Sequence, residues 1–252
     1  MAVLLFFISA FLIFIAYLVN PSSTKFTGPF SSIRLAFIKA FLSISLISYL
    51  LVEVLSLNNQ LSFTSISIAW GIVALGMGIF LWKNYSNIHF QTISFKTIEK
   101  KYQRLLIFGF VFVLLPLLLL SIFIPPNNWD SLAYHLPRIE HWVQNKNIYP
   151  YPTNLIRQII TPPFSEYVLL QLRLLSGNDW FLNLLQYCSL IGVLFIATQL
   201  FQSLKINYKG QILLCAVLIS LPMLIFQSTT TQTDLLSAFY LLAFILFSYL
   251  FV

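Results

Sequence analysis

Two aspartates are the side chains of this sequence best suited to do chemistry. Asp130 follows a long apolar run, and Asp234 follows the six polar residues 228–233. A carboxylate in partly dehydrated surroundings has a raised pKa, which brings it toward the range of a general base. If the two carboxylates converge, they can deprotonate and orient a hydroxyl nucleophile, or hold a divalent ion such as Mg²⁺ or Mn²⁺ through oxygen ligands. A divalent metal is therefore the one cofactor that the pattern leaves open, and the pattern requires none.

Both aspartates also have a simpler interpretation. Each stands where a helix is expected to begin, and aspartate is a preferred N-cap residue because its side chain accepts hydrogen bonds from the first turn. Asp234 would equally suit a plain charged position at a membrane interface. A cap and a catalytic role are compatible, so the sequence leaves both open.

Five further side chains near Asp130 are candidate substrate contacts: Tyr134, His135, Arg138, Arg157 and Glu166. The two arginines suit an anionic substrate because guanidinium binds phosphate through paired donors. The alternative is that they pair with Glu140 or Glu166, and Glu166 itself is either a third acid or a solvated or paired surface residue. His135 and His141 are six residues apart, unlike the i, i+4 spacing of a zinc-binding helix, so no metal site built on histidines is predicted.

Several other chemistries find no motif in this chain. The sequence contains no G-x-S-x-G, no H-E-x-x-H and no P-loop, which weighs against a serine hydrolase, a zinc protease and an ATPase. Cys188 and Cys215 lie inside apolar runs without the spacing of metal ligands. We interpret both cysteines as small apolar side chains.

The elements that must position these residues are membrane helices. Apolar residues make up 59% of the 252 positions and charged residues only 8%, against about 25% charged in soluble domains. Apolar runs of roughly 20 residues, the length that crosses a bilayer, recur along the chain. They predict about seven spans, at residues 2–19, 36–57, 65–83, 105–124, 181–201, 211–227 and 235–252. The fold class is therefore all-α, a polytopic membrane helix bundle.

The basic residues indicate how the bundle is oriented. Lysines and arginines gather in the first and third connections, around Lys25 and from Lys83 to Arg104, and again at Lys205 and Lys209. The alternate connections are poor in them, which is the positive-inside pattern. We expect a multi-pass protein of the inner (plasma) membrane with residues 125–180 outside the cytoplasm. The net charge of +7 is thus a topology signal, and nucleic acid is not an expected partner.

Residues 125–180 form one long loop that is expected to carry its own structure. Leu132, Leu136, Ile139 and Val143 lie close to one face of a helix over 131–144. We expect that amphipathic helix to lie on the outer surface of the membrane. A Pro-rich extended stretch follows, and a second helical segment runs from about 164 to 175, with Gly177 as its stop. The chain divides into three N-terminal spans, 1–104, and a module, 105–252, that contains the loop.

Residues 105–252 resemble the GT-C glycosyltransferases, and most closely the family-39-like bacterial group related to dolichyl-phosphate-mannose protein mannosyltransferases and lipid A aminoarabinose transferases. The resemblance rests on an acid in a large outer loop directly after a span, on a second acid at the outer start of a later span, and on five phrases. These phrases are Asn128-Trp129-Asp130-Ser131-Leu132-Ala133-Tyr134-His135-Leu136-Pro137-Arg138, Tyr151-Pro152-Thr153-Asn154, Arg157-Gln158, Pro162-Pro163-Phe164-Ser165-Glu166-Tyr167 and Thr231-Gln232-Thr233-Asp234.

The resemblance implies a particular reaction. A sugar would pass with inversion from a polyprenyl-phosphate donor to a lipid or glycan acceptor at the outer face, among membrane lipids. Asp130 matches the family's first-loop acid, which would act as the base or orient the acceptor, and Asp234 matches the second acidic position. An arginine would stabilise the leaving phosphate.

Two departures from the family pattern qualify this expectation. Three spans precede the matching region, and the chain ends after four matching spans where family enzymes continue, so the resemblance implies a C-terminally truncated enzyme whose activity as given is open. The alternatives are a membrane transporter or lipid-linked saccharide flippase, which should carry ionisable residues inside its spans, and a non-catalytic membrane subunit.

Overall fold

The computed structural model describes residues 2–19, 30–84 and 98–251, and within these ranges it contains helices and no strand. The order of elements is α1 (Val3–Val19), α2 (Ser31–Leu57), α3 (Phe63–Lys83), α4 (Lys100–Gly109), η3 (Phe110–Leu114), α5 (Leu115–Phe123), η4 (Ser131–His135), α6 (Leu136–Asn145), α7 (Arg157–Ile160), α8 (Phe164–Ser176), α9 (Leu184–Ser203), α10 (Tyr208–Ser220), α11 (Pro222–Gln227) and α12 (Asp234–Phe251). The predicted all-helical fold class is confirmed for this part of the chain.

Four of the described helices are long and apolar enough to cross a membrane. They are α2, α3, the continuous helix from α4 through η3 to α5, and α9. Helices α1, α10 and α12 are apolar but shorter. The chain therefore has the character of a membrane protein, while the predicted number of seven spans is not confirmed.

The predicted span 211–227 is wrong as a single helix. It divides into α10 and α11 at Leu221, whose backbone is extended (φ −75°, ψ 116°). The cause is Pro222, which lacks a backbone N–H and forces the residue before it out of the helical region. Pro116 has a milder effect, because the helix continues through it after the five-residue π-helical segment η3.

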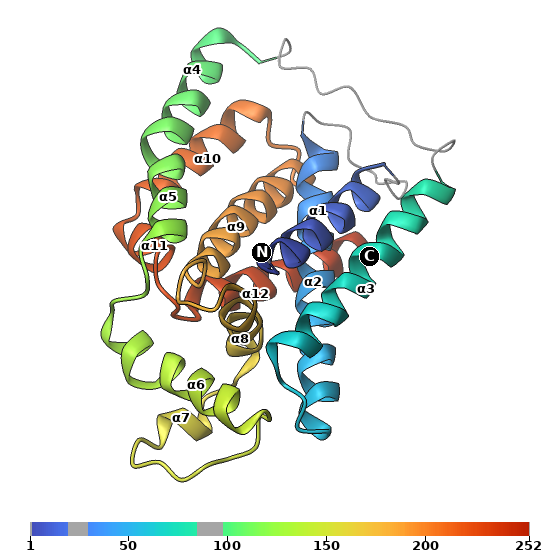
Figure 1. Ribbon diagram of the computed structural model, residues 1–252. Helices are drawn as coiled ribbons and strands as arrows, with labels where there is room; N and C mark the ends of the chain where they lie inside the picture. Colours follow the sequence, from blue (N-terminus) through green and yellow to red (C-terminus); the bar gives the residue numbers. More distant parts are fainter. Residues whose placement is uncertain (1, 20–29, 85–97, 252) are drawn as a thin grey trace.

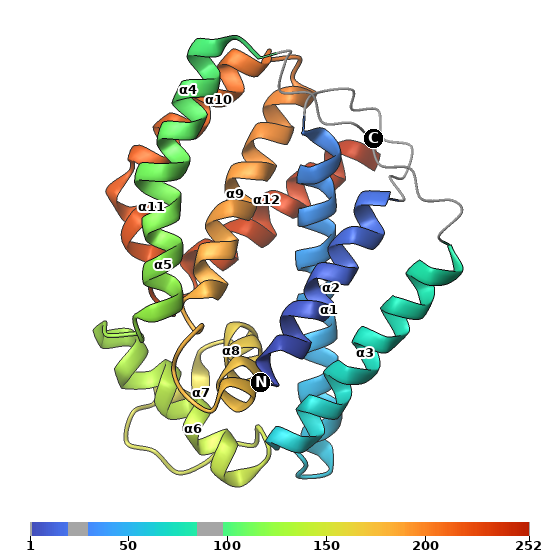
Figure 2. The ribbon, with the colours of Figure 1, turned by 45° about the horizontal axis from the view of Figure 1, so that its top comes forward.

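The described helices give the molecule two distinct ends (Figures 1 and 2). The end of α3, the start of α4 and the connection between α9 and α10, which carry Lys83, Lys100 and Lys205, lie toward one end. Helices α6, α7 and α8 gather at the other end, beside the lower ends of α2 and α3 in Figure 2. The loop helices and these three basic positions are therefore separated along the length of the bundle.

Helix α8 lies inside the bundle, which the sequence did not predict. It packs against α2, α3 and α6, and Leu169 and Leu170 are fully buried. Gln171 links it to two spans, because its Oε1 accepts from Trp70 Nε1 at 2.8 Å and its Nε2 donates to the Ser48 carbonyl at 3.1 Å. The predicted stop is confirmed: Gly177 has φ 72° and ends the helix. The outer loop is thus anchored in the core through its second helix.

The contact between α9 and α12 is the most extensive between any two helices. At the crossing, Phe239 of α12 lies directly over Gly192 of α9 and is itself fully buried. A Cβ atom at position 192 would come within 2.4 Å of Phe239 Cδ2. Only glycine allows this approach, and the approach fixes α12 against the rest of the bundle.

The Gly192→Ala variant should therefore be destabilised by about 1–3 kcal/mol, the usual effect of overpacking a filled core. The measurement is chemical unfolding of the detergent-solubilised protein. Gly76→Ala is the matched control, because a Cβ atom at position 76 of α3 has open space within 4 Å. Equal unfolding of the two variants would show that the Gly192 contact does not hold α12 in place.

Candidate functional site

Asp130 is not the N-cap of the loop helix, so this simpler interpretation is wrong. Its backbone is already helical (φ −63°, ψ −42°), and its side chain makes no capping hydrogen bond. Its Oδ2 instead accepts a hydrogen bond from Gln232 Nε2 at 2.9 Å. Gln232 lies two residues before Asp234, so Asp130 is joined to the segment that carries the second acid.

A second bond between the same two segments lies one residue further along. Ser131 Oγ accepts from Thr231 Oγ1 at 2.6 Å and from the Thr231 backbone N–H at 3.4 Å, and it donates to the Asn128 side-chain carbonyl. Ser131 is fully buried, and Thr231 is 1% exposed. The outer loop and the start of α12, a hundred residues apart in the chain, are therefore held together, and Asp234 is the exposed first residue of that helix.

Behind this junction lies a buried cluster of Arg138, Glu166 and His135. Glu166 Oε1 accepts from Arg138 Nη1 at 2.9 Å and lies 2.9 Å from His135 Nδ1. Its Oε2 accepts from Ser165 Oγ at 2.6 Å. Exposed fractions are 0% for Glu166, 1% for Arg138 and 3% for His135. The cluster joins η4, α6 and the start of α8.

Arg138 directs its guanidinium into the protein. Its Nε donates to the Gln158 carbonyl at 2.7 Å, and its Nη2 donates to the Arg157 carbonyl at 2.8 Å and to Thr161 Oγ1. Of the two interpretations of Arg138, the ion pair with Glu166 is the one that the structure contains. Glu140, the other predicted partner, pairs with Arg173.

Glu166 is an ionised, buried acid and not a solvated surface residue. Burial alone would raise the pKa of its carboxyl, but hydrogen bonds from His135 and Ser165 and the positive charge of Arg138 outweigh that effect. The net result is a pKa below the usual value for glutamate. The carboxylate is therefore available at neutral pH as a fixed acceptor for its neighbours.

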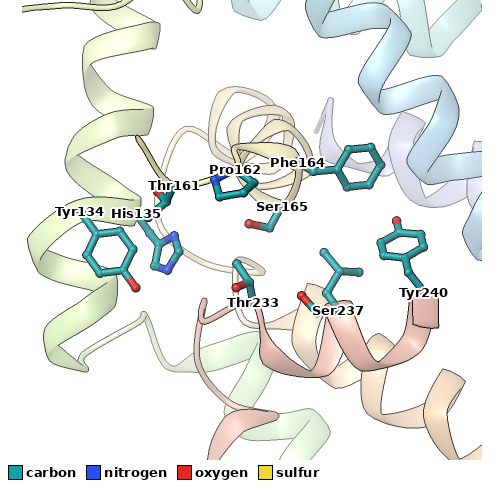
Figure 3. Close-up of a pocket in the computed structure, with 10 residues that line it drawn as sticks. Tyr134, His135, Thr161, Pro162, Phe164, Ser165, Thr233, Ser237 and Tyr240 are labelled. Carbon is teal, nitrogen blue, oxygen red and sulfur yellow. The ribbon is translucent and has the colours of Figure 1, made fainter. Parts of the chain in front are cut away.

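A cavity of about 480 Å³ opens between the loop helices and α12. Its walls come from η4, from the start of α8 and from the first two turns of α12 (Figure 3). The lining residues are Tyr134, His135, Thr161, Pro162, Phe164, Ser165, Thr233, Leu236, Ser237 and Tyr240. In the described part of the chain the hydroxyls of Tyr134, Thr233 and Ser237 have no hydrogen-bond partner. The cavity therefore presents aromatic rings together with free hydroxyl groups.

Several of the predicted residues lie near enough to Tyr134, in the cavity wall, to affect its pKa. Burial raises the pKa of its phenol, and the negative charges of Asp130, Glu166 and Asp234 raise it further, while Arg157 acts in the opposite direction. Arg157 is exposed, and its guanidinium has no hydrogen-bond or ion-pair partner among the residues that the structure describes. Of the predicted site residues, Tyr134 and His135 line the cavity. Arg138 and Glu166 are buried in the cluster described above, and Asp130, Arg157 and Asp234 are not part of the cavity wall.

The sequence reasoning missed the contribution of α12 beyond Asp234. Thr233, Ser237 and Tyr240 follow the i, i+4, i+7 spacing that places side chains on one helix face, so this signal was readable beside the acid. The hydrogen bond from Gln232 to Asp130 could not be predicted from the sequence, because it depends on the two residues being close in space.

Neither a cluster of metal ligands nor a match to a known protein identifies the site further. Among residues 2–19, 30–84 and 98–251 there is no group of three or more histidine, cysteine, aspartate or glutamate side chains that could hold a metal ion. No family model matches the chain, and no curated protein and no solved structure matches it either. The resemblance to GT-C enzymes thus stays a prediction.

The buried pair leads to a stability prediction. Arg138→Met leaves the Glu166 carboxylate buried without its guanidinium partner, so we expect a loss of about 3–5 kcal/mol in the free energy of unfolding. The measurement is chemical unfolding in detergent.

Arg173→Met is the matched control. Arg173 lies near the protein surface and pairs with Glu140 at 2.7 Å and Asp179 at 3.2 Å, and such pairs contribute about 0–1 kcal/mol. The double variant Arg138→Met/Glu166→Gln should recover part of the loss because no charge is left unpaired. Similar losses for Arg138→Met and Arg173→Met would contradict a structural role for the buried cluster.

Proposed function

We propose that this chain is a membrane glycosyltransferase, or the part of one, that moves a sugar from a polyprenyl-phosphate donor to a lipid or glycan acceptor at the outer face of the membrane. The observation that carries the proposal is the cavity between η4 and the start of α12. Asp234 directly follows Thr233 of its wall, and Asp130 is hydrogen-bonded to Gln232, the residue before Thr233. Its volume, about 480 Å³, falls in the range of small-molecule sites.

The lining of the cavity supports a sugar as the ligand. Phe164 and Tyr240 form one wall, with ring centroids 5.4 Å apart in an edge-to-face arrangement, and Tyr134 lies on another wall (Figure 3). Aromatic rings offer apolar surface with a defined shape. The free hydroxyls of Thr233 and Ser237 both donate and accept hydrogen bonds, which matches the hydroxyl groups of a sugar.

In the proposed reaction Asp130 is the base. It takes the proton of the acceptor hydroxyl as the acceptor oxygen bonds to the anomeric carbon, and the bond from that carbon to the phosphate oxygen breaks with its electron pair. Attack from the face opposite the phosphate inverts the configuration. Gln232 holds Oδ2 of Asp130 at 2.9 Å, so the carboxylate has a fixed orientation for proton transfer.

The remaining predicted groups have roles at the opening of the cavity. Arg157, exposed and free of protein partners in the described residues, is the guanidinium that can contact the donor phosphate. Asp234 is the second acid and would orient the acceptor. A divalent ion, if the reaction uses one, would be held by the carboxylates of Asp130 and Asp234 together with the donor phosphate, since these are oxygen ligands.

A transporter is the alternative with an observation in its favour. Arg34 lies in α2, is only 5% exposed, and donates to the side-chain carbonyls of Gln211, at 2.8 Å, and Gln202. Buried charges inside membrane helices often mark transport paths. Arg34, however, lies in the first turn of α2, where its bonds tie that helix to α9 and α10, and neither cavity described for the chain is lined by it.

The catalytic prediction concerns Asp130→Asn, which keeps the shape of the side chain and an acceptor for Gln232 but removes the base. Sugar transfer should fall by about 100-fold or more, the contribution of a general base. The assay uses membranes from cells that express the full-length gene, with a radiolabelled polyprenyl-phosphate sugar.

Asp179→Asn is the control, because Asp179 belongs to the same loop but pairs with Arg173 away from the cavity. If Asp130→Asn transfers sugar as well as the wild type does, Asp130 is not the base. If the wild-type membranes transfer no sugar at all, the non-catalytic alternatives take precedence.

The proposed orientation has its own test. Trp129→Cys and Lys100→Cys, both at exposed positions, are made in a background where Cys188 and Cys215 are replaced by alanine. A membrane-impermeant maleimide added to intact cells should label the cysteine at 129 and leave the one at 100 unlabelled until the cells are opened. The reverse pattern would place the loop in the cytoplasm and exclude the proposed reaction at the outer face.

A further inference from the structure

His135 differs from an ordinary buried histidine in the direction of its second ring nitrogen. The residue is 3% exposed, and Nδ1 is taken by Glu166 at 2.9 Å. Its ring nevertheless lines the cavity, and Figure 3 shows it facing the open space between Tyr134 and Ser165. Nε2 has no partner in the described part of the chain. A buried imidazole thus presents one unused nitrogen to a ligand site.

The start of α8 faces the same cavity. Phe164 and Ser165, the first two residues of this 13-residue helix, both line it. No side chain caps the helix, and the first N–H groups of a helix have no partner within it. The positive end of the helix dipole and these free donors favour an anion at this position. The hydroxyl of Ser165 is not available to a ligand as a donor, because it already donates a hydrogen bond to Glu166.

The charge of the buried cluster depends on His135. Arg138 balances Glu166, so the three side chains are neutral together when the imidazole is neutral and carry one positive charge when Nε2 is protonated. The other charged groups around the cavity are Asp130 from the start of the loop helix, Arg157 from α7 and Asp234 from α12. The titratable phenols that face it are Tyr134 and Tyr240. Among the residues that line the cavity, His135 is the one that can carry a positive charge, because Arg157 is not part of the cavity wall.

We propose that this cavity binds a phosphate group, held by Nε2 of His135 and the first N–H groups of α8, and that His135 takes up a proton from solvent when the phosphate binds. The inference rests on the proposed function, in which the phosphate is that of the lipid-linked donor. It also replaces the expected role of Arg138, which is buried and binds Glu166, two carbonyl groups and Thr161 with four of its N–H donors.

Two substitutions separate ligand binding from a structural role of His135. Asparagine places its amide where Nδ1 stands, so His135→Asn keeps a partner for Glu166 and removes the group that faces the cavity. Glutamine places its amide where Nε2 stands, so His135→Gln keeps a neutral donor in the cavity. His141→Ala is the control, because His141 stacks on Tyr151 at 3.9 Å and does not line the cavity.

The experiment is calorimetric titration of the full-length protein in phosphatidylcholine nanodiscs with farnesyl phosphate, farnesol and inorganic phosphate. Titrations at pH 6 and pH 8, in two buffers of different ionisation enthalpy, report the protons taken up on binding. Histidine side chains ordinarily gain their proton between pH 8 and pH 5. We therefore expect wild type and His141→Ala to bind farnesyl phosphate several-fold more tightly at pH 6, with proton uptake at pH 8.

The variants should divide clearly. His135→Asn should lose about tenfold in affinity, the value of one charged hydrogen bond at about 1.4 kcal/mol per factor of ten, together with the pH dependence. His135→Gln should keep more of the affinity than His135→Asn but lose the pH dependence. Unchanged binding by a folded His135→Asn would overturn the inference, as would equal affinity for farnesol and farnesyl phosphate.

The two remaining outcomes identify the source of the phosphate and separate this inference from the proposed function. Preference for farnesyl phosphate over inorganic phosphate assigns the site to a lipid, whereas equal affinity assigns it to a soluble phosphate and still supports the site. Phosphate binding that depends on His135, in a protein that transfers no sugar, would leave the inference standing and the proposed function rejected. Sugar transfer by wild-type membranes with no phosphate binding in the cavity would support the proposed function and overturn this inference.

Discussion

The ion pair between Arg138 and Glu166 is the interaction on which the outer half of the molecule depends. Both groups are buried, and a buried charge is tolerated only when it is paired and its remaining hydrogen-bonding capacity is filled. Arg138 of α6 therefore binds two other segments: the start of α8 through Glu166, and α7 through the Arg157 and Gln158 carbonyls. The position of α7 and of the start of α8 within this long loop is fixed because both supply hydrogen-bond acceptors to one buried guanidinium.

Fixing the loop does not by itself create a site, because one wall of the cavity belongs to α12. That wall is held from two sides. At the mouth, Ser131 and Asp130 bind Thr231 and Gln232, and deeper in the bundle Phe239 rests on Gly192 of α9. The first two turns of α12 lie between these two attachments, so Thr233 and Ser237 face η4 and the start of α8 across the cavity.

Those features that depend on local composition could be predicted from the sequence. Apolar runs of about twenty residues have no other way to satisfy their backbone in lipid, so the helices over 31–57, 63–83, 100–123 and 184–203 lie close to their predicted positions. The stop at Gly177 could also be predicted, because glycine after the last turn of a helix is a local signal. The burial of α8 could not, because it depends on Trp70 and Ser48, about a hundred residues earlier in the chain, which bind Gln171. The break at Leu221 was missed for a different reason. Pro222 is a local signal, but the span was predicted from the average hydropathy of about twenty residues, which a single proline hardly changes.

The same distinction explains why the chemistry of the site was only half readable. Residue type and position identified the two acids, and the structure joins their segments through Gln232. A cation for an anionic substrate was expected from Arg138 or Arg157, because guanidinium is the usual partner of phosphate. Arg138 is buried, and its hydrogen bonds to Glu166, two carbonyl groups and Thr161 give it a structural role. Arg157 is exposed, so its expected role stays a proposal. The Glu166 carboxylate that Arg138 balances also binds His135 Nδ1. The structural role of Arg138 is thus what directs the second ring nitrogen of His135 toward a cavity whose wall contains no arginine.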